Sequence, residues 1–159
     1  MSPILKLIQT NAKLGTAELA EMLALDPEVV SAEIATWEQD GTIMGYQAIL
    51  DPEKCGHDGV TALIEVKIRP ERGGGFDHLA ERIAKFDQVT SCYLMSGGYD
   101  LCVMVTGDTL REVARFVAER LSTIEGVLST ATRFQLKVYK QNGLLTKQET
   151  GNERLAVTP

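Results

Sequence analysis

The first forty residues carry three short apolar stripes that recur at helical intervals. Each stripe predicts one amphipathic helix, because residues three and four positions apart share a helix face. The stripes are Ile4, Leu5, Leu7 and Ile8; then Leu19, Ala20, Met22 and Leu23; then Val29, Val30, Ile34 and Trp37. The second and third helices are joined by a tight turn at Ala24-Leu25, which predicts a helix-turn-helix.

Capping residues set the expected ends of these helices. Thr16 is placed to cap the second helix and Asp26 the third, with Pro27 at the first helical position, where a missing N–H is harmless. The third helix is expected to end at Gly41. The segment Ile43–Leu50 follows as a predicted strand, so we expect a (winged) helix-turn-helix.

Beyond a polar, glycine-containing connection at 52–59, the pattern changes to alternating strands separated by helical segments. The predicted strands are Val60–Ile68, Val89–Met95, Leu101–Val105 and Val127–Tyr139. One predicted helix carries Phe76, Leu79, Ala80, Ile83 and Phe86, and a long one runs from Leu110 to Ile124 behind a Thr109…Glu112 capping box. The order β-α-β-β-α-β predicts a ferredoxin-like domain, with both helices on one face of a four-stranded antiparallel sheet.

The predicted fold class is therefore α+β, with three regions. Residues 1–52 form the helix-turn-helix head and linking strand, 60–140 the ferredoxin-like effector and oligomerisation domain, and 144–159 a polar, frayed tail. The second face of the sheet is expected to be apolar, through alternating residues of Val60–Ile68 and Phe134–Val138, and to need a cover. We expect a homodimer in which Ile43–Leu50 also pairs across subunits, with higher even-numbered homo-oligomers.

Charge is unevenly distributed along the 159 residues. The chain carries 16 Lys plus Arg against 22 Asp plus Glu, a net charge of −6, and 44% of its residues are hydrophobic, which suits a packed globular protein. Residues 1–52 hold two lysines against eight acids, 2 − 8 = −6, so the whole imbalance lies in the first third. No apolar run approaches the ~18 residues of a membrane helix, and no signal peptide is evident. We expect a cytoplasmic protein without a membrane partner.

The sequence offers little for catalysis or for metal and cofactor binding. Cys55, Cys92 and Cys102 form no C-x-x-C pair, and His57 and His78 lack metal-ligand spacing, so free thiols, no metal and no cofactor are expected. No nucleophile with an adjacent base or paired carboxylate emerges, so no catalytic residue and no enzyme activity are predicted. The run Gly73-Gly74-Gly75 lacks the Lys-Ser/Thr of a phosphate-binding P-loop, so no nucleotide site is predicted.

Three motifs in a fixed order carry a resemblance to a known family. They are Glu38-x-x-Gly41-x-Ile43-x-Gly45-Tyr46, Ser96-Gly97-Gly98-Tyr99-Asp100 and Phe134-x-Leu-Lys-x-Tyr139-Lys-x-Asn-Gly143. With the order of the domains, they resemble the Lrp/AsnC (feast/famine) family of prokaryotic transcription regulators over residues 4–145. The resemblance implies a head that binds double-stranded DNA and a second domain that responds to a small-molecule effector, commonly an amino acid. Decarboxylases of modified tetrapyrroles are similar to this family, but the histidines and arginines they use have no evident counterparts here.

The resemblance implies that the third helix is the recognition helix in the major groove. Residues 27–40 contain four acids and no basic residue, although neutralising phosphates supplies much of the affinity for DNA. Ser31, Thr36 and Gln39 are the candidates for hydrogen bonds to bases or phosphates. The alternative is a ligand- or partner-binding oligomer of the same fold that binds DNA weakly or not at all.

The resemblance also places the loop Ser96-Gly97-Gly98-Tyr99-Asp100 at an effector pocket between dimers. Backbone N–H groups at Gly97 and Gly98 suit a carboxylate, and Asp100 suits an ammonium group. A plain hairpin turn accounts for the same residues, and the two interpretations are compatible. Thr132, with Thr130, is a candidate pocket residue on the last strand, where both could simply pack in the sheet.

Overall fold

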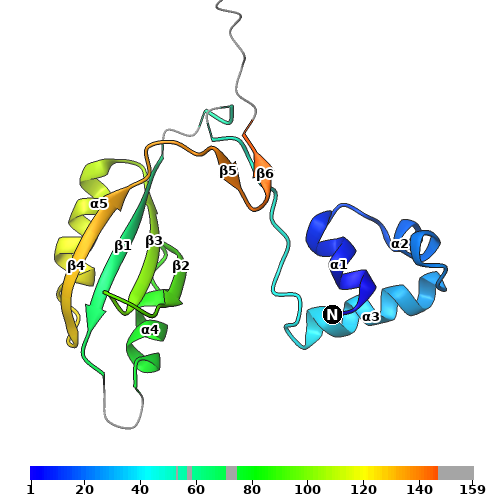
Figure 1. Cartoon of the computed structure of the whole chain (residues 1–159), viewed down its shortest axis with the longest axis horizontal. Helices are drawn as coiled ribbons and strands as arrows, with labels where there is room; N and C mark the ends of the chain where they lie inside the picture. Colours follow the sequence, from blue (N-terminus) through cyan, green and yellow to red (C-terminus); the bar gives the residue numbers. More distant parts are fainter. Residues whose placement is uncertain (53, 57–58, 71–74, 147–159) are drawn as a thin grey trace, which may run out of the picture. The chain divides into compact units, whose positions relative to one another are not determined.

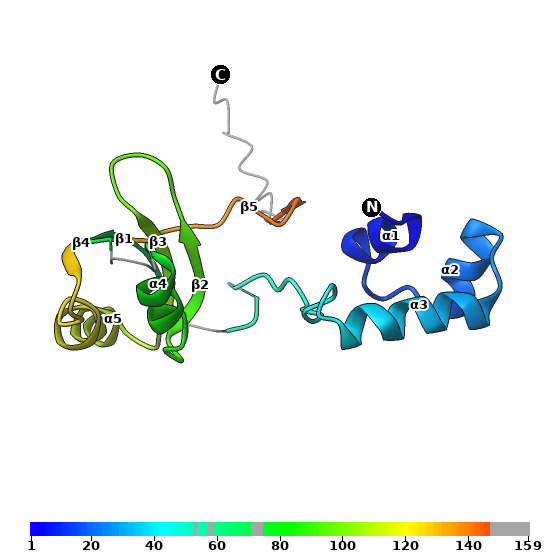
Figure 2. The ribbon, with the colours of Figure 1, turned by 90° about the horizontal axis from the view of Figure 1, so that it is seen from below.

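The computed structural model describes residues 1–52, 54–56, 59–70 and 75–146. The chain divides into two compact units, of which the first is Met1–Ile49 and the second begins at Leu50. Figures 1 and 2 show a helical first unit and a second unit built on a sheet. Among the described residues, no helix is long and apolar enough to span a membrane.

The head, which is the first unit, consists of α1 (Pro3–Thr10), α2 (Thr16–Leu23) and α3 (Pro27–Gln39). The predicted cap of α3 is confirmed, because the Asp26 carboxylate accepts a hydrogen bond of 2.8 Å from the backbone N–H of Glu28. The turn between α2 and α3 places Ala24 in the left-handed region, at φ 53°. One small core holds the three helices together, and its buried members are Ile4, Ile8, Leu19, Ala20 and Val30.

Three predictions for the head are wrong in detail. Gly15, not Thr16, is the N-cap of α2, because the Glu18 carboxylate already accepts the Gly15 N–H at 2.9 Å. Met22 and Val29 were expected to be buried but are 58% and 48% exposed. Each lies more than a quarter turn from the centre of the buried stripe on its helix, since successive residues are 100° apart.

The predicted strand at 43–50 is not formed in the single chain. The backbone N–H of Ile43 donates to the carbonyl of Trp37 at 2.8 Å, and the residues that follow have no regular structure, with Met44 97% exposed. A strand needs a neighbour for its N–H and C=O groups. The described part of the chain pairs no strand with this segment, so the head has no wing here.

The second unit has the predicted ferredoxin-like architecture. Its strands are β1 (Val60–Ile68), β2 (Val89–Leu94), β3 (Leu101–Gly107) and β4 (Val127–Phe134), and their order is β2-β3-β1-β4. All three pairings are antiparallel. The helices α4 (Asp77–Ala84) and α5 (Leu110–Phe116) lie on one face of this sheet, as Figure 2 shows. The core lies between these two layers and includes Ala62, Ile64, Val66 and Ile68 of β1.

The predicted long helix at 110–124 is divided. The Thr109 cap is confirmed, because its hydroxyl oxygen accepts the Glu112 N–H at 3.1 Å. After α5, however, the chain continues as a π-helical turn, η1 (Val117–Leu121), in which the N–H of Ser122 donates to the carbonyl of Val117 at 2.8 Å. The wider turn keeps both Val117 and Leu121 in the core.

The predicted last strand, Val127–Tyr139, ends five residues early, at Phe134. Within the described residues its neighbour in the sheet is β1 alone, which begins at Val60, so the last rung is the 2.9 Å hydrogen bond from Gln135 N–H to the Thr61 carbonyl. Beyond it Leu136 is 95% exposed. A hairpin of β5 (Lys140–Gln141) and β6 (Leu144–Leu145) follows, so the predicted tail does not start at 144. Residues 147–159 of that tail lie outside the described residues.

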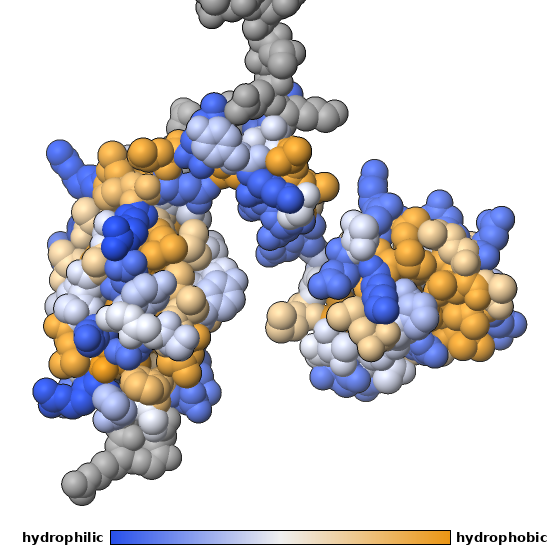
Figure 3. Space-filling model, in the orientation of Figure 1, coloured by the Kyte–Doolittle hydropathy of each residue, from blue (hydrophilic) through white to orange (hydrophobic). Residues whose placement is uncertain are grey.

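The sheet face that no helix covers is mixed in character. The alternating apolar residues of β1, and Phe134 opposite Ala62, lie under the helices, so the expectation of an open apolar face built from them is wrong. On the open face Leu63 lies opposite Met104 and Arg133. Arg133 donates two hydrogen bonds of 3.0 Å to the Glu65 carboxylate. Figure 3, which looks onto this face, shows polar and apolar side chains interspersed.

Candidate functional site

One stripe of α3 faces away from the core of the head. Val30, Ile34 and Trp37 pack inward, and the opposite stripe follows the helical intervals of four, three and four residues. Its members, all exposed, are Glu28, Ala32, Ala35 and Gln39. This is the surface that a recognition helix presents to the major groove.

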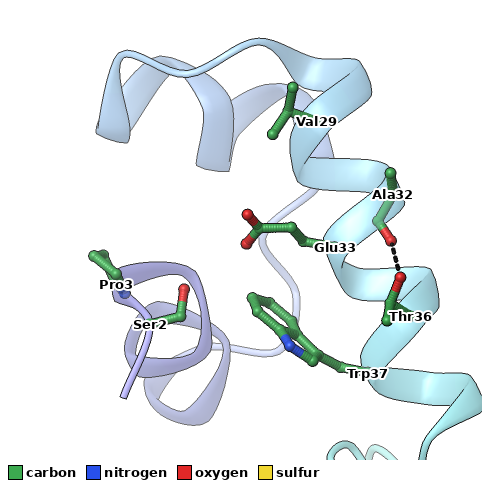
Figure 4. A pocket seen from close by; sticks show the side chains of 7 residues that line it. All are labelled: Ser2, Pro3, Val29, Ala32, Glu33, Thr36 and Trp37. Atoms are coloured by element: carbon green, nitrogen blue, oxygen red, sulfur yellow. Dashed lines mark hydrogen bonds between the residues drawn. The ribbon is translucent and has the colours of Figure 1, made fainter.

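The three predicted DNA-contacting residues are exposed on or beside this outward stripe. Gln39 lies on it, and Ser31 and Thr36 flank it. Thr36 cannot serve as a hydrogen-bond donor to DNA as it stands, because its hydroxyl donates to the Ala32 carbonyl at 2.9 Å (Figure 4). Within the described residues, the side chains of Ser31 and Gln39 have no hydrogen-bond partner, so both can engage a ligand.

Two of the four acids in residues 27–40, Glu38 of α3 and the C-cap Asp40, are held by the chain that follows the helix. The Tyr46 hydroxyl donates to the Glu38 carboxylate at 2.9 Å, and desolvation, together with this carboxylate, raises the pKa of Tyr46. The Asp40 carboxylate accepts the Thr42 N–H at 2.8 Å, which lowers the pKa of Asp40. Both carboxylates therefore stabilise the segment that follows α3.

The third acid, Glu33, points into an open hollow of about 710 Å³ within the head. Figure 4 shows Glu33 and Trp37 directed toward the start of α1. The hollow is lined by Ser2, Pro3, Val29, Ala32, Glu33, Thr36 and Trp37. Only Glu28 remains on the outward stripe, in the first turn of α3, where the helix dipole favours a carboxylate. The four negative charges of residues 27–40 therefore do not share one face.

The predicted effector loop connects β2 to β3. Ser96, Gly97 and Gly98 are exposed, and Gly97 adopts φ 131°, a conformation that side chains rarely allow. Asp100 is half-buried: its carboxylate accepts the Ile68 N–H at 2.8 Å, and its own N–H donates to the Val66 carbonyl at 3.0 Å. Asp100 therefore fastens the loop to the end of β1.

The structure does not bring Thr132 to this loop. Thr132 pairs with Ile64, on the helix-covered side of the sheet, and Thr130 on the same side shares a hydrogen bond of 3.2 Å with Ser122. Strand β1 lies between β4 and β3, so two strand spacings, ~10 Å, separate Thr132 from the strand that the loop enters. Within one chain, Thr132 and the loop form no common pocket.

The remaining sequence candidates do not form a chemical site. Cys55, Cys92 and Cys102 are free thiols, and burial raises the pKa of the last two. No group of His, Cys, Asp and Glu in the described part of the chain could hold a metal ion. His57, Gly73 and Gly74 lie outside the described residues.

Several residues of the site were missed by sequence reasoning. No local pattern predicts the hydrogen bond between Glu38 and Tyr46 or the hollow into which Glu33 points. Both depend on how the chain folds back. The bond between Asp100 and Ile68 joins residues far apart in sequence for the same reason. By contrast, Ala32 and Ala35 could have been found, because the inward positions of α3 were predicted and the outward ones lie opposite.

Comparison with known proteins places this geometry in a family. The Lrp/AsnC ligand-binding domain model matches residues 61–145. The uncharacterized helix-turn-helix-type transcriptional regulator YugG of Bacillus subtilis is 42% identical over 157 residues, covering 98% of this chain and 95% of its own. The proline dehydrogenase transcriptional activator of Rhodobacter capsulatus is 29% identical over 140 residues, covering 87% of this chain and 90% of its own.

Solved structures agree with these matches. A transcriptional regulator of Neisseria meningitidis, in complex with L-Met, superposes with a TM-score of 0.68 at 29% identity, over 87% of this chain and 88% of its own. Escherichia coli AsnC shares the fold, with a TM-score of 0.63 over 87% of this chain and 91% of its own, at 24% identity. These relatives are transcription regulators and not enzymes. The chain belongs to the Lrp/AsnC family of transcription regulators.

Proposed function

We propose that the head binds double-stranded DNA through the outward stripe of α3 and that an amino acid, bound by the second unit, modulates this binding. The observation that carries the proposal is the placement of the four acids in residues 27–40. Three of the four point to the helix exit or into the hollow, so the stripe itself carries one negative charge. Ser31, Thr36 and Gln39 lie on or beside that stripe, as a DNA-contacting set requires.

The effector site in this proposal is the loop Ser96-Gly97-Gly98-Tyr99-Asp100. In this proposal the N–H groups of the exposed Gly97 and Gly98 bind the carboxylate of an amino acid. One oxygen of Asp100 accepts the Ile68 N–H, and the other, to which no residue in the described part of the chain donates, binds the ammonium group in this proposal. The L-Met complex of the Neisseria relative supports this ligand class. Thr132 contributes only if a second copy brings its own β4 to the loop.

The proposed assembly is a homodimer that associates further into even-numbered oligomers. Among the described residues, the segment at 43–50 has no strand partner and one face of the sheet has no covering helix. A second copy can complete both surfaces. In this arrangement residues 1–52 are the DNA-binding head and 60–140 the effector and oligomerisation domain. A regulator of this kind works in the prokaryotic cytoplasm, without a cofactor or a membrane partner.

The second candidate function is a ligand- or partner-binding oligomer that has lost direct contact with DNA. The net charge favours it: residues 1–52 hold two lysines against eight acids, which repels a polyanion. In that case the helix-turn-helix would serve only as a folded appendage of the sheet unit.

A selection experiment separates the two functions. The full chain is incubated with a pool of random duplexes at low salt, and bound duplexes are recovered and amplified through several rounds. Enrichment of a defined sequence, and a change in its affinity when one of the twenty amino acids is added, is the expected result. If no sequence is enriched while an amino acid still changes the mass measured by light scattering, the second function is correct.

A further inference from the structure

We infer that the hollow in the head binds an arginine side chain of a partner protein, between the Glu33 carboxylate and the Trp37 indole. The segment of the partner that this surface fits is short and basic, with apolar residues beside the arginine. The inference concerns the hollow and not the outward stripe of α3, and it does not depend on the proposed binding of DNA.

The hollow lies between the start of α1 and one face of α3. Its volume of about 710 Å³ is that of a site for a small molecule or a long side chain. Glu33 and Trp37 are four positions apart and so are neighbours on this face of the helix. Both are directed into the hollow (Figure 4). A carboxylate and an aromatic ring therefore line the same space.

The ring of Trp37 is held in place by the core of the head. Trp37 is half-buried and packs against the cluster that includes Ile4 and Val30, while the rest of its surface lines the hollow. A side chain that is already fixed by packing loses little conformational freedom when a ligand binds. One wall of the hollow is therefore formed before any partner arrives.

Glu33 is the only charged residue among the seven that line the hollow, and its neighbours there include the apolar side chains of Pro3, Val29 and Trp37. Within the described part of the chain, the Glu33 carboxylate has no hydrogen-bond or ion-pair partner. A carboxylate beside apolar surface gains most from a ligand that brings a positive charge.

The two hydroxyl groups at the hollow are engaged within the head. The Ser2 hydroxyl oxygen accepts the Ile4 N–H at 3.3 Å, and the Thr36 hydroxyl donates to the Ala32 carbonyl at 2.9 Å. Neither group holds the Glu33 carboxylate. The chemistry that the hollow offers to a ligand is therefore that of one carboxylate and one indole ring.

This pair of groups suits a guanidinium better than other side chains. A guanidinium is planar, donates two parallel hydrogen bonds to a carboxylate and stacks on an aromatic face, whereas the ammonium of lysine acts as a point charge. A negatively charged ligand would be repelled by Glu33. A neutral apolar side chain would remove water from the carboxylate without replacing its hydrogen bonds. Arginine is therefore the expected occupant.

The distribution of charge indicates that another protein supplies this arginine. Residues 1–52 carry a net charge of −6, so two heads repel each other. The rest of the chain has 16 − 2 = 14 basic and 22 − 8 = 14 acidic residues, so it brings no net positive charge to the head. A basic segment of a different protein is attracted by the head as a whole and by Glu33 in particular.

The experiment uses the full chain and the fluorescence of Trp37, which is the only tryptophan in the sequence and therefore reports on the hollow. The probe is N-acetyl-arginine methylamide. Its blocked ends lack the carboxylate and the ammonium group that the proposed effector loop requires. The citrulline analogue, which has a similar shape and no charge, is the matched neutral probe.

We expect the arginine probe to change the emission of Trp37 in a saturable way. The citrulline probe should bind about fivefold more weakly, which corresponds to about 1 kcal/mol for an ion pair and a cation–π contact at an open site. A peptide with leucine on both sides of the arginine should bind more tightly than the single residue, because Pro3 and Val29 offer apolar surface beside Glu33.

A pair of variants ties this response to the hollow. Glu33→Gln removes the charge and should lower the affinity for the arginine probe to that for the citrulline probe. Glu21→Gln removes one charge from an exposed position of α2 that does not line the hollow, and it should leave the preference for arginine unchanged. Melting temperatures of both variants check that the head remains folded.

A preference for arginine that Glu33→Gln abolishes and Glu21→Gln retains supports the inference. Equal affinity for the two probes, a preference that survives Glu33→Gln, or no response of Trp37 overturns it. An emission of Trp37 that changes with protein concentration in the absence of a probe, and does so only when Glu33 is present, would show that a second copy fills the hollow. That result would overturn the assignment to a partner protein.

Discussion

The two units of the molecule differ in how far their functional surfaces are separate from their cores. The head is held by five buried residues, whereas fourteen buried residues form the core of the second unit, counted over the described chain. On α3 the residues proposed to contact DNA take no part in the core. In the second unit Asp100, at the proposed effector loop, also hydrogen-bonds to Ile68 of β1. In the head, the proposed DNA-contacting residues and the residues that stabilise the fold are therefore different ones. In the effector loop, Asp100 has both roles.

The largest expected effect comes from removing one core residue of each unit. Leu19→Ala and Ile64→Ala both create a cavity at a fully buried position, which typically costs about 2–5 kcal/mol. The small core of the head cannot absorb this loss, so Leu19→Ala should abolish DNA binding while the sheet stays folded. Hydrogen exchange resolved by segment measures both units. If Leu19→Ala leaves α1–α3 protected, the head is more robust than its core indicates.

Substitutions of Asp100 test whether this residue both binds the effector and holds the loop to β1. Asp100→Asn keeps an oxygen that can accept the Ile68 N–H but removes the charge, so the melting temperature should change little. Loss of one charge-assisted hydrogen bond, worth about 1.5–3 kcal/mol, should weaken amino-acid binding roughly ten- to a hundredfold. Calorimetric titration measures this loss of affinity. The ligand is an amino acid that changes the mass of the oligomer measured by light scattering.

Asp100→Ala is the matched control. It also leaves the Ile68 N–H without its acceptor, at a cost of about 1–3 kcal/mol, so this variant should lose both stability and ligand response. A large loss of stability in both variants, with an unaltered ligand response, would show that Asp100 is only a turn residue.

The acids of α3 give a smaller effect. Glu33→Gln and Glu38→Gln each remove one charge from an exposed position, so each should strengthen DNA binding by a fraction of a kcal/mol, and less at high salt. The gain from Glu38→Gln should be the smaller one, because Tyr46 then donates to a neutral acceptor and the exit from α3 is held less firmly. Tyr46→Phe is the control for that contact. Equal gains at all salt concentrations would contradict the electrostatic explanation.

The sequence predicted the order of the elements and most of the core, because apolar periodicity is a local property. It failed where a second segment decides the outcome. Ile43–Leu50 has the pattern of a strand but no partner among the described residues of the single chain, and the strand that starts at Val127 ends where its antiparallel neighbour β1 begins. One local signal was overlooked: Asn142-Gly143 is typical of a two-residue hairpin turn, and both residues adopt positive φ between β5 and β6.

The candidate site shows the same division. The recognition helix and its three polar candidates followed from the sequence and the family resemblance. The net charge of α3 suggested a face that repels DNA. The sequence gives the number of charges on a helix but not the directions in which their side chains point. Only the hydrogen bonds of Glu38 and Asp40, and the hollow beside Glu33, show that these carboxylates point elsewhere.

The smallest effect is expected at the turn of the helix-turn-helix. Ala24 adopts φ 53°, which costs an L-residue roughly 1–2 kcal/mol relative to glycine, and glycine loses about 0.4–1 kcal/mol through the greater entropy of its unfolded state. Ala24→Gly should therefore raise the stability of the head slightly, by about 0.5 kcal/mol. Chemical denaturation followed by the fluorescence of Trp37 measures it, and a clear loss of stability would contradict the assigned turn geometry.

The salt dependence of DNA binding tests most directly whether the head carries the interaction. Fluorescence anisotropy of the enriched duplex, titrated with the full chain at several salt concentrations, gives the slope of log affinity against log salt. Two heads offer four lysine side chains, so we predict binding with a slope no steeper than about −4. A much steeper slope would show that basic residues of the second unit hold the DNA, and no binding at the lowest salt would show that the head does not bind DNA at all.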